Sequence, residues 1–148
     1  MRIVKTSELC LDSFKMRDLI KTFKLNLKPV ACSRPKISRN GNVYYSKNYE
    51  KFRHEIEYHL QTFEPEEKIR GAIGIDIIFI LKPIEARHKR PFPIVRPDLD
   101  NYIKSVLDGM KNFWIDDSQV CRIFSEKRYD FENKTDSIEI SLWKIEDE

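Results

Sequence analysis

The chain has 148 residues, of which 41% are hydrophobic and 34% charged, proportions typical of one globular domain. A chain of this size buries roughly 70% of its extended surface on folding, so its core needs no disulfide or metal. No apolar run approaches the roughly 18 residues of a membrane-spanning helix, and the N-terminus lacks the apolar run of a secretion signal. Three unpaired cysteines, Cys10, Cys32 and Cys121, are expected to be small buried side chains and fit a reducing, cytoplasmic location.

The net charge of +3 conceals an uneven distribution. Residues 28–53 carry seven bases against one acid, a net charge of +6, whereas residues 116–148 carry five bases against ten acids, a net charge of −5. Tyrosines such as Tyr44, Tyr45 and Tyr49 lie among the bases of the first segment. Bases mixed with aromatic rings are typical of surfaces that bind nucleic acid. A solvated loop followed by an outer helix face explains the same composition, so charge alone leaves both interpretations open.

The N-terminal third of the chain predicts an extension, a strand and a turn. Residues 1–21 mix charges with loosely spaced apolar side chains and are interpreted as an N-terminal extension to a domain covering residues 22–148. Thr22–Lys28 alternates apolar and polar residues, which indicates a half-buried strand. A basic loop follows, in which Asn40-Gly41-Asn42 predicts a turn before a short strand at residues 43–45.

The middle of the chain predicts two helices separated by a strand. Ser46 is expected to cap a helix that runs from Lys47 to about Phe63. Gly74–Leu81 is rich in β-branched residues and predicts a central strand. Residues 82–97 contain four prolines among several bases and are expected to form a basic loop. The strongest helical stripe follows, with apolar residues at Leu99, Tyr102, Ile103, Val106, Leu107 and Met110.

Two further strands are predicted at the C-terminal end, at Val120–Phe131 and Ser137–Ile145. A polar turn near Asn133 separates them, so we expect them to form an antiparallel hairpin. Together these elements predict a single α+β domain with a mixed β-sheet and two main helices.

Acidic residues gather around the second helix. Asp98 stands where a helix N-cap belongs, Asp100 lies in the first turn, Lys104 lies four residues further on the same face, and Asp108 continues that face. Carboxylates beside a lysine and basic loops are what phosphoryl chemistry with Mg²⁺ requires, because Mg²⁺ takes oxygen ligands and a lysine stabilises phosphate charge. A structural interpretation is also available, in which Asp98 caps the helix and Asp100 pairs with Lys104.

A second acidic pair, Asp116 and Asp117, follows Phe113-Trp114-Ile115. Taken alone, Asp-Asp-Ser is typical of a turn that hydrogen-bonds its own backbone. A chain reversal after Asn112 would allow Asp117 to return toward the helix, but sequence position does not show that it does.

The run Arg-Pro-Asp-Leu-Asp-Asn-x-x-Lys (96–104), then Asp108, then Phe-Trp-Ile-Asp-Asp-Ser-Gln-Val (113–120) resembles the signature of the RusA family of Holliday junction resolvases. The earlier Lys-Pro-Val-Ala-Cys-Ser-Arg-Pro-Lys (28–36) with Val43-Tyr44-Tyr45 is also similar to the family's N-terminal strand and basic loop. The resemblance covers about residues 22–145.

The resemblance implies a RusA-like, homodimeric endonuclease that depends on Mg²⁺, with Mn²⁺ able to substitute, and that resolves four-way DNA junctions by paired symmetric nicks in recombination and repair. By motif, the essential aspartates and metal ligands map onto Asp98, Asp100 and Asp117, and the functional lysine maps onto Lys104; Asp116 is the less favoured neighbour. The family's habit favours a phage or prophage source. No membrane and no small-molecule substrate is expected.

Phosphate contacts are expected from bases in the loops, where they would set affinity and position rather than sequence preference. The candidates are Arg34, Lys36, Arg39, Lys47, Arg87, Lys89, Arg90 and Arg96. Two other functions compete with a resolvase: a nuclease for flaps or other branched DNA, and a noncatalytic junction-binding module in which the aspartates only cap and pair.

Overall fold

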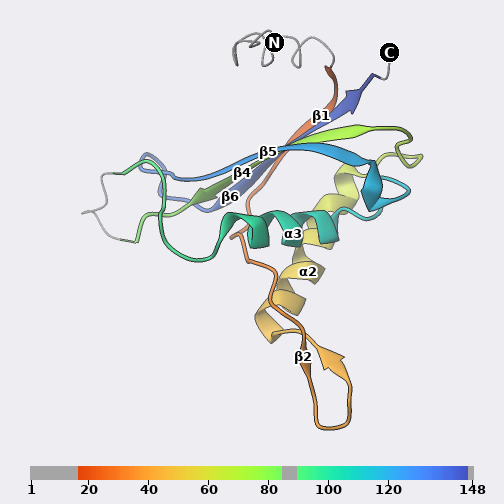
Figure 1. Ribbon diagram of the computed structural model, residues 1–148. Helices are drawn as coiled ribbons and strands as arrows, with labels where there is room; N and C mark the ends of the chain where they lie inside the picture. Colours follow the sequence, from red (N-terminus) through yellow and green to blue (C-terminus); the bar gives the residue numbers. More distant parts are fainter. Residues whose placement is uncertain (1–16, 85–89, 147–148) are drawn as a thin grey trace, which may run out of the picture.

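A computed structural model describes residues 17–84 and 90–146 of the chain (Figure 1). Four strands form one mixed sheet in the order β1-β6-β4-β5, and two helices cover one of its faces. The strands of this sheet are β1 (Arg17–Leu25), β4 (Ile73–Leu81), β5 (Val120–Tyr129) and β6 (Ser137–Ile145). The helices are α2 (Lys47–Leu60) and α3 (Leu99–Gly109). The predicted α+β domain with a mixed sheet and two helices is therefore confirmed.

Four short elements complete the described part of the fold. Strands β2 (Lys36–Ile37) and β3 (Val43–Tyr44) pair only with each other. Two 3₁₀ turns, η1 (Gln61–Phe63) and η2 (Asp117–Gln119), follow α2 and precede β5 respectively. Ser46 caps α2 as predicted, because its hydroxyl accepts a hydrogen bond from the Tyr49 amide at 3.3 Å. The predicted turn at Asn40-Gly41-Asn42 is also present, and Gly41 adopts a φ of 80° that favours glycine.

The core lies between the sheet and the two helices. Alternate side chains of β4 point toward the helices and are buried, as expected of a strand whose successive residues face opposite ways. They meet the apolar stripe of α3 and that of α2, where Phe52 and Ile56 are buried. The helices approach so closely at Gly109 that a Cβ there would stand 2.7 Å from Cγ2 of Ile56. This packing fixes the position of α3 relative to the sheet.

The predicted C-terminal hairpin is wrong, because β4 lies between β5 and β6. Strand β5 runs parallel to β4 at the sheet edge, and β6 pairs antiparallel with both β4 and β1. After β5 the chain crosses the end of β4, where the Asp130 amide donates to the Leu81 carbonyl and the Lys82 amide donates to the Asp136 carboxylate. The isoleucine-rich β4, buried on its inner face, thereby gains a hydrogen-bonded neighbour on each side.

Strand β1 begins at Arg17, earlier than predicted, and ends at Leu25 rather than Lys28. Residues 17–21 of the predicted extension therefore belong to the sheet, and residues 1–16 lie outside the described residues. The expectation of buried cysteines is wrong for Cys121, which is exposed, and Cys32 is only half-buried. Cys121 falls at the register shift where β5, the edge strand, starts to pair with β4. No helix within the two described ranges has the length and apolarity needed to cross a membrane.

Candidate active site

One face of α3 forms the wall of an open pocket of about 220 Å³. Asp100, Lys104 and Asp108 are spaced by four residues, so they share this face of the helix. The opposite wall comes from Trp114 and from Asp117, which begins η2. The pocket is lined by Asp100, Ile103, Lys104, Leu107, Asp108, Trp114, Asp117 and Val120. The chain reversal after α3 therefore does return Asp117 to the helix, as the sequence allowed but did not show.

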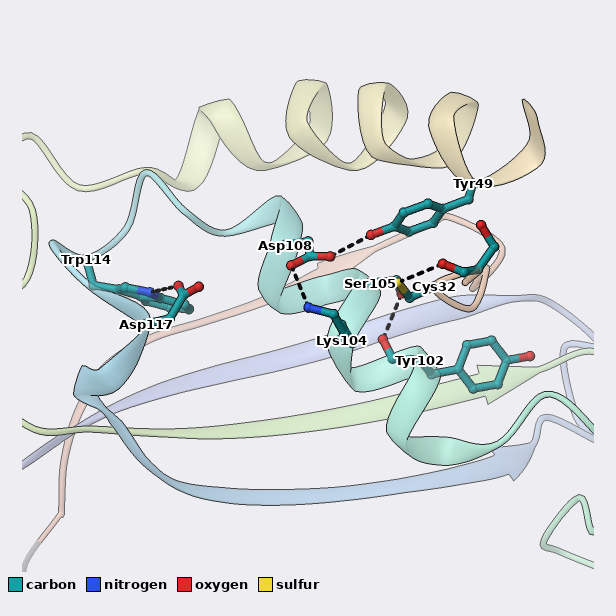
Figure 2. Close-up of polar contacts among 9 residues, drawn as sticks. Cys32, Tyr49, Tyr102, Lys104, Ser105, Asp108, Trp114 and Asp117 are labelled. Atoms are coloured by element: carbon teal, nitrogen blue, oxygen red, sulfur yellow. Dashed lines mark hydrogen bonds and ion pairs between the residues drawn. The ribbon is translucent and has the colours of Figure 1, made fainter. Parts of the chain in front are cut away.

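Lys104 is held by Asp108, four residues further along α3 (Figure 2). Its Nζ lies 3.4 Å from Oδ1 of Asp108, while Oδ2 of Asp108 accepts a hydrogen bond of 2.6 Å from the Tyr49 hydroxyl. The i,i+4 pair between Asp100 and Lys104, which the structural interpretation expected, is absent from the hydrogen bonds and ion pairs of the described residues. Asp100 is exposed, and it lines the pocket.

Tyr49 ties this arrangement to α2. Burial raises the pKa of the Tyr49 hydroxyl far above its ordinary value, and the hydrogen bond to Asp108 raises it further. The hydroxyl therefore stays protonated and acts as a fixed donor to Asp108. Asp108 in turn lies 3.4 Å from the ammonium of Lys104 and holds it on the pocket side of α3.

The two adjacent aspartates of η2 have different partners. Asp116 caps the turn: its Oδ1 accepts from the Ser118 amide at 2.9 Å, and the Gln119 side chain accepts from the Asp116 amide. Hydrogen bonds from Ser118 lower the pKa of the Asp116 carboxyl. Asp117 takes no part in the cap; its Oδ1 accepts from the indole Nε1 of Trp114 at 2.9 Å (Figure 2). The turn interpretation thus holds for Asp116, and Asp117 is left facing the pocket.

Asp98 stands just before the first turn of α3, at the N-cap position, but its side chain makes no capping hydrogen bond. The loop that precedes it is held instead by Lys127 of β5, whose Nζ donates to the carbonyls of Val95 at 2.7 Å and Pro97 at 2.8 Å. Lys127 pairs in register with buried Phe79, so it reaches α3 from the covered face of the sheet. Asp98 is exposed and does not line the pocket that Asp100 and Asp117 share.

Comparison with known protein families identifies the chain. The model of the endodeoxyribonuclease RusA family matches residues 26–142. The chain belongs to the RusA family. A search of curated proteins finds no match. The matched range contains every element of the fold except β1 and the end of β6, and it includes all of the pocket residues. Membership of this family makes the protein a nuclease that acts on DNA.

The predicted DNA-binding residues of this RusA protein fall into two groups. Arg34, Lys36 and Arg39 lie on the segment that carries β2 and β3, and Lys47 begins α2. Arg90 and Arg96 lie in the loop that leads to Asp98. These six side chains are all exposed, whereas Arg87 and Lys89 lie outside the described residues.

The three predicted metal ligands are not gathered in advance. Among residues 17–84 and 90–146, no three His, Cys, Asp or Glu side chains are close enough to hold a metal ion. The donors nevertheless fit a hard cation, because Asp100 and Asp117 present carboxylate oxygens to one pocket and Mg²⁺ commonly takes one or two carboxylates and keeps several waters. The assignment of Asp98, Asp100 and Asp117 as ligands stays a prediction.

Three residues around the site were missed as functional by sequence reasoning. The sequence places Tyr49 among the aromatic rings of the basic segment and Trp114 in the run that resembles the RusA signature, but it assigns neither a carboxylate partner, and it assigns no role to Lys127. Lys127 does carry a signal, because it occupies an inward-facing position of a strand, where a lysine is unusual. Nothing local to Tyr49 or Trp114 indicates which carboxylate each contacts.

Proposed function

We propose that this protein is a Mg²⁺-dependent endonuclease that resolves four-way DNA junctions by paired symmetric nicks, as a homodimer acting in DNA recombination and repair. The observation that carries the proposal is the convergence of Asp100, Asp117 and Lys104 on one pocket, with Asp98 exposed two residues before Asp100. Family membership supports nuclease chemistry at this pocket, since its residues fall within the matched range.

Each side chain has a distinct role in this proposal. Asp98, Asp100 and Asp117 hold the cation, with Mn²⁺ able to replace Mg²⁺. A bound Mg²⁺ supplies a water of lowered pKa and neutralises charge on the scissile phosphate. Lys104 stabilises phosphate charge from the helix side, and Asp108 with Tyr49 keeps its ammonium in place.

The capping and pairing roles that a noncatalytic module requires are filled by other residues. Asp116 caps η2, and Asp108 pairs with Lys104. Asp98 makes no capping bond, and Asp100 forms no ion pair with a described residue. Exposed carboxylates beside a DNA-binding surface repel phosphates unless a cation lies between them, so their exposure favours metal-assisted cleavage over simple binding.

The homodimer follows from the symmetry of the substrate. A four-way junction has approximate two-fold symmetry, and one chain carries one such pocket. An isologous dimer presents two equivalent pockets to two opposed strands. Arg34, Lys36, Arg39, Lys47, Arg90 and Arg96 would hold phosphates on either side of each pocket.

The test is nicking of a supercoiled plasmid that extrudes a cruciform, with and without Mg²⁺. Paired nicks within one binding event give a linear product, whereas single nicks give an open circle. We expect linear product that requires Mg²⁺ or Mn²⁺ and disappears in Asp100→Asn, while binding to a synthetic junction persists.

Two outcomes would contradict the proposal. Equal cleavage of a synthetic flap and of a four-way junction, at equal enzyme, would indicate a general branched-DNA nuclease. Tight junction binding without nicking in either metal, over several junction sequences, would indicate a noncatalytic module.

A further inference from the structure

Residues 33–46 form an arm that projects from the body of the molecule, away from the sheet (Figure 1). Strands β2 and β3 pair within it, and its tip is closed by a hydrogen bond of 2.9 Å from the Ser38 amide to the Asn42 carbonyl. At its base the Ser46 amide donates to the Ser33 hydroxyl at 3.3 Å. Two paired residues per strand are too few to make a hairpin stable alone, so the arm depends on its attachment to the body.

The arm carries apolar side chains that the body does not cover. Ile37 pairs with Val43, which places both on one face of the hairpin, and these side chains are 73% and 64% exposed. Lys36 pairs with Tyr44 on the opposite face, where the tyrosine is 47% exposed. Single exposed apolar residues are common. An opposed apolar pair on a projecting hairpin, however, forms an apolar surface whose burial by a partner is favourable.

The charge of the arm limits the class of partner. Arg34, Lys36 and Arg39 are all exposed, and residues 33–46 contain no acid. The arm of a second copy would carry the same positive charge and be repelled. The arm therefore fits a polyanion that also offers apolar surface.

The arm is attached to the helix that carries the candidate catalytic residues. Immediately before the arm, the Cys32 amide donates to the Asn101 carbonyl at 2.9 Å, beside Asp100 in the first turn of α3. Immediately after it, Tyr49 donates to Asp108 in the last turns of α3. The arm is thus anchored at both ends to the helix that forms one wall of the pocket.

We propose that the arm recognises the branch point of DNA, with Ile37 and Val43 contacting base faces that the branch leaves unstacked and Arg34, Lys36 and Arg39 holding the flanking phosphates. Intact duplex stacks its bases and hides their faces, whereas a branch exposes them to a wedge of apolar side chains. This inference rests on the proposed function, because it assigns the choice of branched over linear DNA to the arm.

The test uses binding alone, in the Asp100→Asn background without Mg²⁺, so that cleavage does not enter. A four-way junction carries 2-aminopurine, a base whose fluorescence rises when it unstacks, next to the branch point. We expect Ile37→Ala/Val43→Ala to raise the Kd for the junction about 10-fold, to change the Kd for a linear duplex by less than about twofold, and to abolish the fluorescence rise.

Three matched variants sharpen the test. Ile37→Thr/Val43→Thr keeps the β-branched shape that suits a strand. If this variant loses the junction preference as the double alanine variant does, the cause is the lost apolar contact and not a collapsed hairpin. Tyr58→Ala removes another side chain, 72% exposed on α2, and is expected to change neither Kd. Arg39→Gln is expected to weaken binding to both DNAs and to reduce the salt dependence by about one phosphate contact.

The arm proposal is overturned if both double variants keep the wild-type ratio of junction to duplex affinity and the fluorescence rise. If that happens while the wild-type enzyme still linearises the cruciform plasmid, the arm assignment fails and the proposed function stands. If the wild type never nicks a junction but the double variants lose the preference and the fluorescence rise, the arm assignment stands and the resolvase proposal fails.

Discussion

The pocket on α3 and the arm of residues 33–46 differ in how firmly neighbouring residues hold their side chains. In the pocket, Lys104 is held by Asp108, Asp108 by Tyr49, and Asp117 by Trp114. In the arm, the bases and the Ile37–Val43 pair are exposed to solvent. Cleavage needs groups fixed to within a fraction of an ångström, whereas binding can use groups that become ordered when the partner arrives. The contrast separates the part of the molecule suited to cleavage from the part suited to recognition.

The largest effect we predict among these residues, short of removing a metal ligand, is that of Lys104→Met. It should lower the single-turnover nicking rate about 10²- to 10³-fold, because the proposed role of its ammonium is to stabilise phosphate charge in the pocket. Lys51→Met is the matched control: Lys51 also forms an i,i+4 pair on a helix, with Glu55 at 3.7 Å, but outside the pocket. It should nick within about twofold of wild type, since exposed pairs contribute little. Equal losses in both variants would contradict the pocket assignment.

Lys127→Met should have a smaller effect, lowering the nicking rate about 10-fold, because the loop before Asp98 loses its two hydrogen bonds and misplaces the carboxylate. We class Lys127 as a positioning residue, so the Mg²⁺ concentration for half-maximal rate should rise as well, and Lys127→Arg should restore part of both. In a Trp143→Phe background, Mg²⁺ titration of Trp114 fluorescence measures the same shift without cleavage. A reduced rate with unchanged Mg²⁺ dependence would contradict this role.

Alanine substitutions at two glycines compare how tightly the two regions are packed, since Gly109 lies in α3 and Gly41 lies in the arm. Gly109→Ala brings a Cβ against buried Ile56, so the free energy of unfolding should fall by about 1–3 kcal/mol despite the better helix propensity of alanine. Gly41→Ala meets no neighbour but strains a positive φ, at a local cost of about 1–2 kcal/mol. Because the arm packs little, we expect Gly41→Ala to leave the main unfolding transition nearly unchanged in urea. A larger loss of unfolding free energy in Gly41→Ala than in Gly109→Ala would show that the arm unfolds together with the core.

The smallest effect concerns acid stability. The pKa of the Asp116 carboxyl is lowered in the folded protein. Its ionised form therefore stabilises the fold at pH values above the ordinary aspartate pKa of about 3.9. This contribution is lost as the pH falls through the lowered pKa. Asp116→Ala should therefore be slightly less stable than wild type at pH 7, and the difference should narrow below about pH 4. Urea unfolding of both proteins at the two pH values measures this difference in the free energy of unfolding. A difference that widens in acid would contradict the capping role of Asp116.

Much of the scaffold could be predicted because its signals are local. The apolar period of α3, the isoleucine-rich β4 and the glycine turn of the arm each follow from neighbouring residues. The order of the sheet could not be predicted, since it depends on which strand pairs with β4, and proximity in sequence favoured the wrong partner for β6.

The candidate site likewise combines features that the sequence predicts with contacts that it does not predict. Asp100 and Lys104 share a helix face by their spacing, so sequence placed them together correctly. The link from Tyr49 to Asp108 joins positions 59 residues apart, and that from Lys127 to Val95 joins positions 32 residues apart, so neither follows from a local pattern. Asp116 and Asp117 are the same residue type side by side, and only the backbone of the turn assigns the cap to one of them.

This last pair offers the most direct test of the account, because the two positions differ only in where the turn points each carboxylate. The measurement is the single-turnover nicking rate of Asp117→Asn and Asp116→Asn on the same four-way junction, with saturating protein and Mg²⁺. We predict a loss of about 10³-fold or more for Asp117→Asn and a rate close to wild type for Asp116→Asn, whose amide can still accept the capping hydrogen bond. Full activity in Asp117→Asn, or equal losses in the two variants, would contradict the assignment of this pocket as the catalytic centre.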